Sequence, residues 1–209
     1  YLGIPAGLGD SIFDNIAAEP IKDREIRRFD RIMAGVDWGF YPDPWAFNRI
    51  HYDAARRTLY IFCEFCRTRM LNCDIAEEIK RLGFAKERIR ADCAEPKSND
   101  DLRRLGISRI MPSVKGRDSI LNGIAAISEY RITVHPDCVN MIRELSSYVY
   151  DDRVSENGKK MPKDSDNHLC DAMRYAFEDV KRFHPRREEK PIYRDTEIGG
   201  ADLNGGWDI

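Results

Sequence analysis

Three aspartates occupy positions from which their carboxylates can share metal ions. Asp37 and Asp92 each close a short apolar run that indicates a buried strand, and Asp171 lies near the start of the last predicted helix, residues 166–180. Two carboxylates at the ends of neighbouring strands can bind one divalent cation, and a third carboxylate from a helix can complete the site. These three residues therefore form a candidate metal centre.

Carboxylate oxygens are the ligands that Mg²⁺ and Mn²⁺ prefer in proteins. Two such ions about 3.5–4 Å apart can activate a water molecule and stabilise the leaving oxygen of a phosphodiester. Several carboxylates are needed to hold the two ions, and without metal these carboxylates repel one another. The residue types favour metal-dependent phosphodiester hydrolysis, with a metal affinity that depends on pH.

Each of these residues also has an ordinary structural interpretation. An aspartate after a strand is common in turns, which applies to Asp37, and Asp92 could equally cap a following turn. On a helical wheel Asp171 lies roughly opposite the apolar face, as a solvated residue would. Asp166 is a more natural helix N-cap than a ligand. His168 could orient Asp171 or contact the metal or phosphate, although a lone histidine is usually incidental.

The elements that must position these residues follow in a simple order. Three strands come first, with short turns that favour antiparallel pairing, at residues 31–37, 45–52 and 58–65. Helices and short strands then alternate, at residues 74–82, 88–92, 98–106, 107–111, 120–127, 131–134 and 138–145. Ser98 and Asp101 resemble a capping box that opens the second of these helices. A hairpin over residues 148–164, turning near Gly158, precedes the last helix.

This order predicts an α/β fold in which helices flank a mixed β-sheet, with three antiparallel strands followed by parallel strands. Of the 209 residues, 42% are hydrophobic, which is enough for one domain with a packed core. No apolar run approaches the length of a membrane span. The formal net charge of −2 argues against tight, independent binding of DNA. It leaves open a nuclease whose acidic centre offsets a basic rim, or whose DNA is delivered by another domain.

The six cysteines do not indicate a disulfide framework or a zinc site. A chain of this size with this many core residues does not need disulfides, so we expect reduced thiols in a cytoplasm. Cys63 and Cys66 have a spacing typical of zinc ligands, but they lie in a predicted strand, where residues three apart point to opposite faces. No matching second pair follows, so zinc is not expected.

Four segments together resemble one family, the nuclease domain of the large terminase subunit of tailed bacteriophages and prophages. They match its first catalytic segment, its second segment, a basic turn and its last catalytic helix. In this sequence they read GVDWGF at residues 35–40 with Asp43 and Pro44 following, ADCAEPKS at 91–98, KGRDSI at 115–120 and DNHLCDAMRYA at 166–176. One such segment would be weak evidence, but four in the expected order, across residues 31–181, are specific.

The resemblance implies a ribonuclease-H-like fold and an endonuclease that cuts concatemeric double-stranded viral DNA during genome packaging. It implies that Asp37 bridges two divalent cations, Mn²⁺ or Mg²⁺, with Asp92 and Asp171 as the other principal ligands. His168 becomes an accessory catalytic residue near the metals. Lys97 and Lys115 lie in matching segments and are the expected phosphate contacts, although both could instead be solvated charges.

The same resemblance sets the expected domain organisation and partners. The family carries an upstream ATPase motor, but this sequence has no G-x-x-x-x-G-K-S/T loop and begins at Tyr1. We expect residues 1–30 to be a linker from a missing ATPase domain, residues 31–184 the nuclease domain, and residues 185–209 a flexible tail. The expected partners are double-stranded DNA, the upstream ATPase motor domain of the same polypeptide, the portal protein and the small terminase subunit. The expected location is the cytoplasm of the infected or lysogenic bacterial host, with no membrane.

Three other functions remain open at this stage. A Holliday-junction resolvase or transposase core also uses carboxylates on such a sheet, although the AEPKS segment at residues 94–98 favours the terminase. An Asp-x-Gly turn also opens the phosphate loop of actin-like ATPases and sugar kinases, but those folds need a second lobe. A non-catalytic packaging scaffold that docks on a portal is disfavoured by the three intact aspartates. Because no helix-turn-helix or finger motif is present, we expect cleavage without sequence preference.

Overall fold

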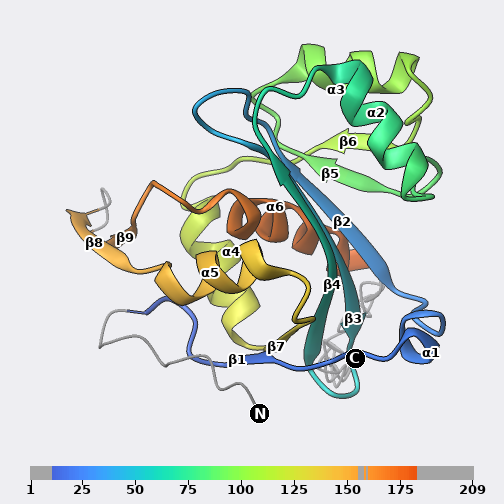
Figure 1. Ribbon diagram of the computed structural model, residues 1–209. Coiled ribbons are helices and arrows are strands. Elements are labelled where there is room, and N and C mark those ends of the chain that lie inside the picture. The colour runs from blue at the N-terminus through green and yellow to red at the C-terminus, as the bar shows by residue number, and fades with distance from the viewer. Residues whose placement is uncertain (1–10, 155–157, 159, 183–209) are drawn as a thin grey trace, which may run out of the picture.

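The computed structural model describes residues 11–154, 158 and 160–182, and a seven-stranded sheet forms its centre (Figure 1). The strands lie in the order β1-β7-β4-β3-β2-β5-β6. Their bounds are β1 Ile16–Ala18, β2 Ile32–Asp37, β3 Trp45–Asp53, β4 Thr58–Arg67, β5 Ile89–Ala91, β6 Ile110–Pro112 and β7 Arg131–Val134. A separate ribbon pairs β8, Tyr150–Val154, with β9, Lys160–Pro162.

Six α-helices and one 3₁₀ segment connect or follow these strands in the described part of the chain. They are α1 Asp23–Ile26, α2 Asn72–Arg81, α3 Pro96–Arg104, α4 Ser119–Ser128, α5 Val139–Ser147, α6 His168–Phe177 and the 3₁₀ segment Glu178–Arg182. None of the helices in these residues is long and apolar enough to span a membrane.

The sheet has the mixed pairing that the sequence predicts. β2, β3 and β4 pair antiparallel, which their short turns require. β5 and β6 then add in parallel beyond β2, while β7 and β1 add in parallel beyond β4. The three antiparallel strands therefore form the middle of the sheet, and β2 and β5 are parallel neighbours.

The two faces of the sheet are covered by different helices (Figure 1). α4, α5 and α6 pack on one face, around a core that includes Met33, Ile50, Leu59, Leu145 and Met173. α2 and α3 cover the β2, β5 and β6 end of the other face, around Val36, Trp45, Phe47, Ile79 and Leu102. Because strand residues alternate between faces, Gly35 and Asp37 share the α6 face with Met33.

α6 lies unusually close to β2. A Cβ atom placed on Gly35 would lie 1.8 Å from the carbonyl oxygen of Ala172 and 3.1 Å from the Cβ of Ala176. No side chain fits in that space, so glycine on the strand and small residues on the helix let the two backbones approach. This contact sets how near α6 comes to the end of β2.

The domain was predicted to begin at residue 31, but residues before this position already pack in the fold. The described part of the expected linker belongs to the fold, because β1 pairs with β7 at the edge of the sheet. Ile12 and Phe13 are buried in the α4–α6 core. A three-residue strand is too short to show an alternating pattern, which is why the sequence did not reveal it. Expectations for residues 1–10 and for the tail, residues 185–209, lie outside the described residues.

Two predicted helix starts are also corrected. α3 begins at Pro96 after Glu95, so Ser98 lies within the helix and does not open a capping box. Proline suits the first helical position because its φ angle is already helical. α6 has Asn167 at its N-cap, whereas Asp166 precedes the helix with a left-handed φ of 52°. The predicted hairpin is confirmed as paired strands, while its turn residues 155–157 and 159 lie outside the described residues.

Candidate metal centre

Two of the three predicted aspartates meet at one edge of the sheet. Asp37 is the last residue of β2, and Asp92 follows directly after β5, its parallel neighbour. The Asp92 backbone N–H donates a hydrogen bond of 3.0 Å to the carbonyl of Val36. The parallel pairing therefore continues to the point where both carboxylates leave the sheet, as predicted.

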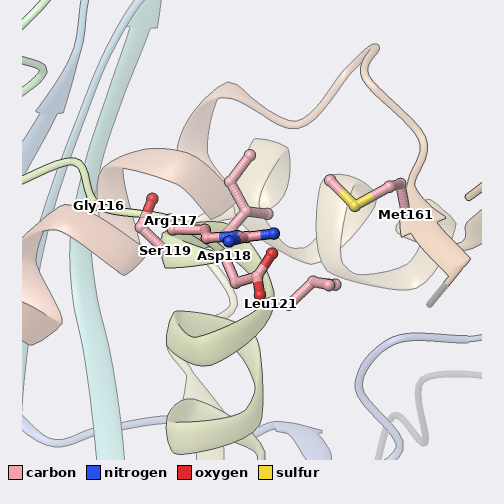
Figure 2. Close-up of a pocket in the computed structure, with 7 residues that line it drawn as sticks. Gly116, Arg117, Asp118, Ser119, Leu121 and Met161 are labelled. Carbon is pink, nitrogen blue, oxygen red and sulfur yellow. The ribbon is translucent and has the colours of Figure 1, made fainter. Parts of the chain in front are cut away.

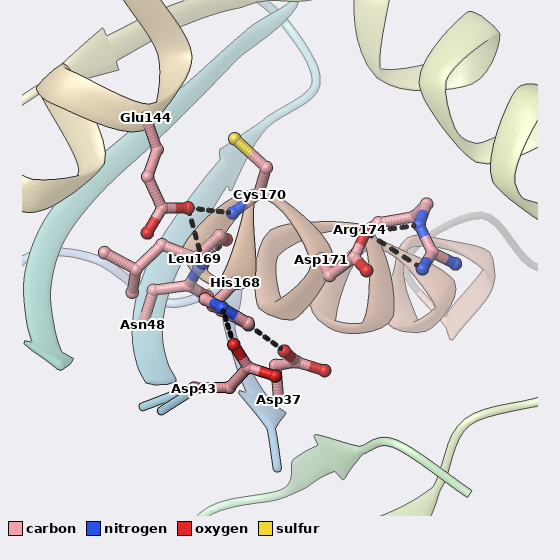
Figure 3. Close-up of polar contacts among 9 residues, drawn as sticks. All are labelled: Asp37, Asp43, Asn48, Glu144, His168, Leu169, Cys170, Asp171 and Arg174. Carbon is pink, nitrogen blue, oxygen red and sulfur yellow. Dashed lines mark hydrogen bonds and ion pairs between the residues drawn. The ribbon is translucent and has the colours of Figure 1, made fainter. Parts of the chain in front are cut away.

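α6 brings the other two predicted residues to the same edge (Figure 3). His168 is the first residue of this helix, and its Nδ1 lies 3.0 Å from Oδ2 of Asp37. The His168 Nε2 lies 3.5 Å from Oδ1 of Asp43, in the loop after β2. Asp171 follows one turn later with a side chain only 20% exposed. The helical wheel was therefore a poor guide, because Asp171 is largely buried rather than solvated.

Each carboxylate faces a cationic or ionisable partner from the protein. Asp37 contacts His168, Oδ1 of Asp92 lies 2.6 Å from Nζ of Lys115, and Oδ1 of Asp171 lies 3.1 Å from the Arg174 guanidinium. Consistent with this pairing, no three His, Cys, Asp or Glu side chains in the described residues lie close enough to hold one metal ion as they stand. A shared ion therefore requires side-chain rotation away from these partners.

The electrostatics show that the three carboxylates interact. Burial raises the pKa of Asp37, as do the negative charges of Asp171 and Asp92, against the hydrogen bond from His168. Burial also raises the pKa of Asp171, with Arg174 opposing it and Asp92 adding to it. Such buried, mutually repelling carboxylates gain from a hard divalent cation. The donor set fits Mg²⁺ or Mn²⁺.

Asp92 differs from the other two aspartates. Burial raises its pKa, but the contacts with Lys115, the Ala94 amide and the Tyr175 hydroxyl together outweigh burial and leave the pKa below its usual value. Asp92 is therefore the member of the three that stays ionised most readily.

The two predicted phosphate contacts lie in different places. Lys115 lies at the centre itself, in a loop fixed by the Val114 N–H, which donates to both carboxylate oxygens of Glu178 at 3.1 Å. The residues that follow Lys115, 116–121, line a pocket of about 350 Å³ together with Met161 of β9 (Figure 2). Lys97 is exposed on the first turn of α3. The structure therefore brings Lys115 to the carboxylates, whereas Lys97 forms no ion pair with them in the described part of the chain and is exposed on α3.

A model of the family described as "Terminase RNAseH like domain" matches residues 37–179, a span that contains Asp37, Asp92 and Asp171. The chain belongs to this family. It is 37% identical to the large terminase subunit of Bacillus phage SPP1, an alignment covering 98% of this chain and 46% of that protein. It is 30% identical to the PBSX phage terminase large subunit of Bacillus subtilis strain 168, covering 75% and 38% of the two chains. The terminase domain thus spans about half, or less, of the relatives it matches.

Solved structures confirm the ribonuclease-H-like fold of this terminase domain. It is similar to the crystal structure of the SPP1 large terminase nuclease domain with bound Mn, with a TM-score of 0.73 and 36% identity over 80% of this chain and 98% of that one. The nuclease of the thermophilic phage G20c with bound magnesium has a TM-score of 0.60 at 18% identity, covering 81% and 97%, and supports the fold alone.

In this terminase domain a buried carboxylate from α5 holds the start of α6 (Figure 3). Oε2 of Glu144 accepts hydrogen bonds from the backbone N–H groups of Leu169 at 2.7 Å and Cys170 at 3.2 Å. The Asn48 side chain donates to the Leu169 carbonyl at 2.9 Å. The two Glu144 contacts satisfy N–H groups that a helix start leaves unpaired. They fix the turn that presents His168 to Asp37.

Burial raises the pKa of Glu144 to about 7. A folded-state pKa above the ordinary carboxyl value means that the free energy of unfolding is highest at low pH and falls as pH rises through about 7. Glu144→Gln keeps an oxygen that can accept both N–H groups but cannot ionise. We expect the variant to gain stability relative to the wild type between pH 5 and pH 8, measured by urea unfolding. Glu77→Gln, exposed on α2, is the matched control, and a Glu144→Gln profile parallel to the wild type would contradict the argument.

Several residues that shape the centre of this terminase domain were not predicted from the sequence. Glu144 left a signal, because it lies on the face of α5 that carries the buried Met141 and Leu145. Arg174 also left one, since it follows Asp171 by three residues on a helix, where such pairs meet. Asp43 and Tyr175 lay inside the matched segments, but only the fold shows that they reach His168 and Asp92.

Proposed function

We propose that this domain is the metal-dependent endonuclease of a viral DNA-packaging terminase, and that it cuts concatemeric double-stranded DNA by two-metal hydrolysis. The observation that carries the proposal is the convergence of Asp37, Asp92 and Asp171 from β2, β5 and α6 at one edge of the sheet. The similar SPP1 nuclease domain, solved with bound Mn, supports it.

In this proposal two divalent cations, Mn²⁺ or Mg²⁺, would be held by Asp37 as the shared ligand, with Asp92 and Asp171 as the remaining protein carboxylates. When bound, the cations activate a water molecule and stabilise the leaving oxygen of the phosphodiester. Without metal the three carboxylates repel one another. Cations that bind them only in the folded state would therefore raise the free energy of unfolding.

The protein's own cations hold the carboxylates and then serve the substrate. Lys115 balances the charge of Asp92, and with that carboxylate bound to a cation the Nζ would be free to contact a DNA phosphate. Arg174 lies beside Asp171 and offsets the effect of burial on its pKa, which favours the ionised form. His168 holds one oxygen of Asp37 and thereby sets the direction of the other. Lys97 offers a second, outer phosphate contact.

The test is cleavage of supercoiled plasmid with Mn²⁺, with Mg²⁺ or with EDTA. We expect nicking and linearisation that need metal and that fall sharply in Asp171→Asn. Asp100→Asn, an exposed aspartate on α3 paired with Arg103, is the matched control and should cut like the wild type. Absence of cutting with either metal, at high protein concentration, would contradict the proposal and favour a scaffold that docks on a portal.

The wider assembly belongs to the same proposal. Curated relatives about twice as long support an upstream ATPase motor domain in the same polypeptide. We expect that motor, the portal protein and the small terminase subunit to deliver the DNA in the cytoplasm of the infected or lysogenic host. Because these partners would hold the DNA, the nuclease domain does not need a strongly positive charge, and its net charge is −2.

A further inference from the structure

Two loops beside the metal centre expose large apolar side chains. The loop after β2 carries Phe40 and Tyr41, which are 54% and 64% exposed, and the turn after β4 carries Leu71, which is 57% exposed. These are three of the five exposed large hydrophobic side chains in the described residues. Such clustering on a surface marks an interaction site more often than scattered exposure does. We call Phe40, Tyr41, Arg69 and Leu71 the aromatic rim.

The aromatic rim is assembled by contacts between its two loops. The backbone N–H of Arg69 donates to the carbonyl of Phe40 at 2.6 Å, and the Arg69 guanidinium lies 4.5 Å from the centre of the Tyr41 ring. Arg69 has a φ of 59°, a left-handed conformation that favours glycine. Arg69 holds this conformation with its guanidinium over the Tyr41 ring. The rim therefore presents a cation and two aromatic rings together.

A pocket of about 210 Å³ adjoins the rim. It lies between the two loops and the start of α3, and its lining includes Trp38, Phe40, Met70, Asn72 and Ser98. Aromatic and thioether groups stand here beside an amide, a hydroxyl and the carboxylate of Glu95. This combination suits a flat ring with hydrogen-bonding edges, which describes a nucleobase.

The rim is continuous with the metal centre. Phe40 and Tyr41 lie between Asp37 and Asp43, and both of these aspartates contact His168. The loop leaves the sheet beyond the end of β2, on the side where α6 begins (Figure 1). A DNA strand with a phosphate at Asp37 therefore passes beside this loop.

We propose that the aromatic rim binds an unpaired base of the DNA strand being cut, stacked on Phe40 or Tyr41, with Arg69 attracted to the backbone. This proposal rests on the proposed nuclease function. Aromatic rings beside arginines bind single-stranded nucleic acid with little regard to sequence, because every base has a flat face. In a paired, stacked duplex those faces are covered. The domain therefore prefers DNA that is locally unpaired next to the cleavage position.

The test compares two duplexes of equal length, one fully paired and one with a short unpaired bubble, cut by the full chain in Mn²⁺. We expect the bubble to be cut faster. Phe40→Ala or Tyr41→Ala should reduce this advantage at least about fivefold, the lower end of the cost of removing one stacking partner. Phe40→Trp, which keeps a stacking face, should retain the advantage. Val139→Ala, 62% exposed on α5, is the control and should match the wild type.

The outcomes separate the rim from the nuclease. If the wild type, Phe40→Ala and Tyr41→Ala all cut both duplexes with the same bubble preference, base binding by the aromatic rim is contradicted. The proposed nuclease function would be unaffected by this result. In that case the rim is a surface for a protein segment. A wild type that cuts neither duplex would overturn the proposed function and the rim with it.

Discussion

Replacing Asp37 with asparagine is expected to lower the rate of Mn²⁺-dependent plasmid cleavage by a factor on the order of 10³ or more. Asp37 is the proposed bridge between the cations. The charges of Asp92, Asp171 and His168 all affect the pKa of this carboxylate. An amide supplies one weaker oxygen ligand and no charge. The loss should therefore exceed that of Asp92→Asn or Asp171→Asn.

Stability measurements separate this effect from unfolding. Burial raises the pKa of Asp37, so its ionised form lowers the free energy of unfolding as pH rises, and a neutral side chain removes that cost. Asp37→Asn should then be at least as stable as the wild type at pH 7 without metal. Asp43→Asn, 67% exposed and 3.5 Å from His168, is the matched control, with a loss of about 10- to 100-fold at most. Cleavage by Asp37→Asn within about tenfold of the wild type would exclude Asp37 as the bridging ligand.

Gly35→Ala is expected to destabilise the domain by about 3 kcal/mol and to weaken Mn²⁺ binding. The new Cβ would overlap the carbonyl oxygen of Ala172, only 1.8 Å away, and backbone atoms cannot rotate aside as a side chain can. Either β2 or α6 must shift, and a shift of α6 carries His168 and Asp171 away from Asp37. Urea unfolding and Mn²⁺ titration measure the two effects.

Gly116→Ala makes the same chemical change where a Cβ would meet nothing within 4 Å. Its effect on the free energy of unfolding should stay within about 0.5 kcal/mol. If Gly35→Ala is as stable as this control and binds Mn²⁺ equally well, the close contact between β2 and α6 does not position the centre.

The sequence predicted those parts of the centre that depend on local pattern. Asp37 and Asp92 were found because each ends a short apolar run, and apolar runs reveal buried strands. The structure shows that these two strands are parallel neighbours. Asp171 was joined to them by its position near the start of the last predicted helix, and the resemblance to the terminase nuclease gave His168 its accessory role. The structure places all four residues at one edge of the sheet.

The parts that depend on distant packing were not accessible from the sequence. A helical wheel places Asp171 opposite the apolar face because it records the helix alone, whereas burial against the sheet raises the pKa of this residue. The space for Arg174 comes from Gly123 on α4, where a Cβ would lie 2.7 Å from the arginine side chain. The pairing of Lys115 with Asp92 joins two loops that are far apart in the chain. Each of these contacts exists only once the helices have packed.

The most direct test of the central claim is calorimetric titration of Mn²⁺ into the wild type and into Asp37→Asn, Asp92→Asn and Asp171→Asn. We expect two Mn²⁺ ions per wild-type chain, loss of at least one ion in each variant, and the weakest binding in Asp37→Asn. Wild-type protein that binds no Mn²⁺, or three variants that bind it as the wild type does, would contradict the assignment of these aspartates as the metal centre.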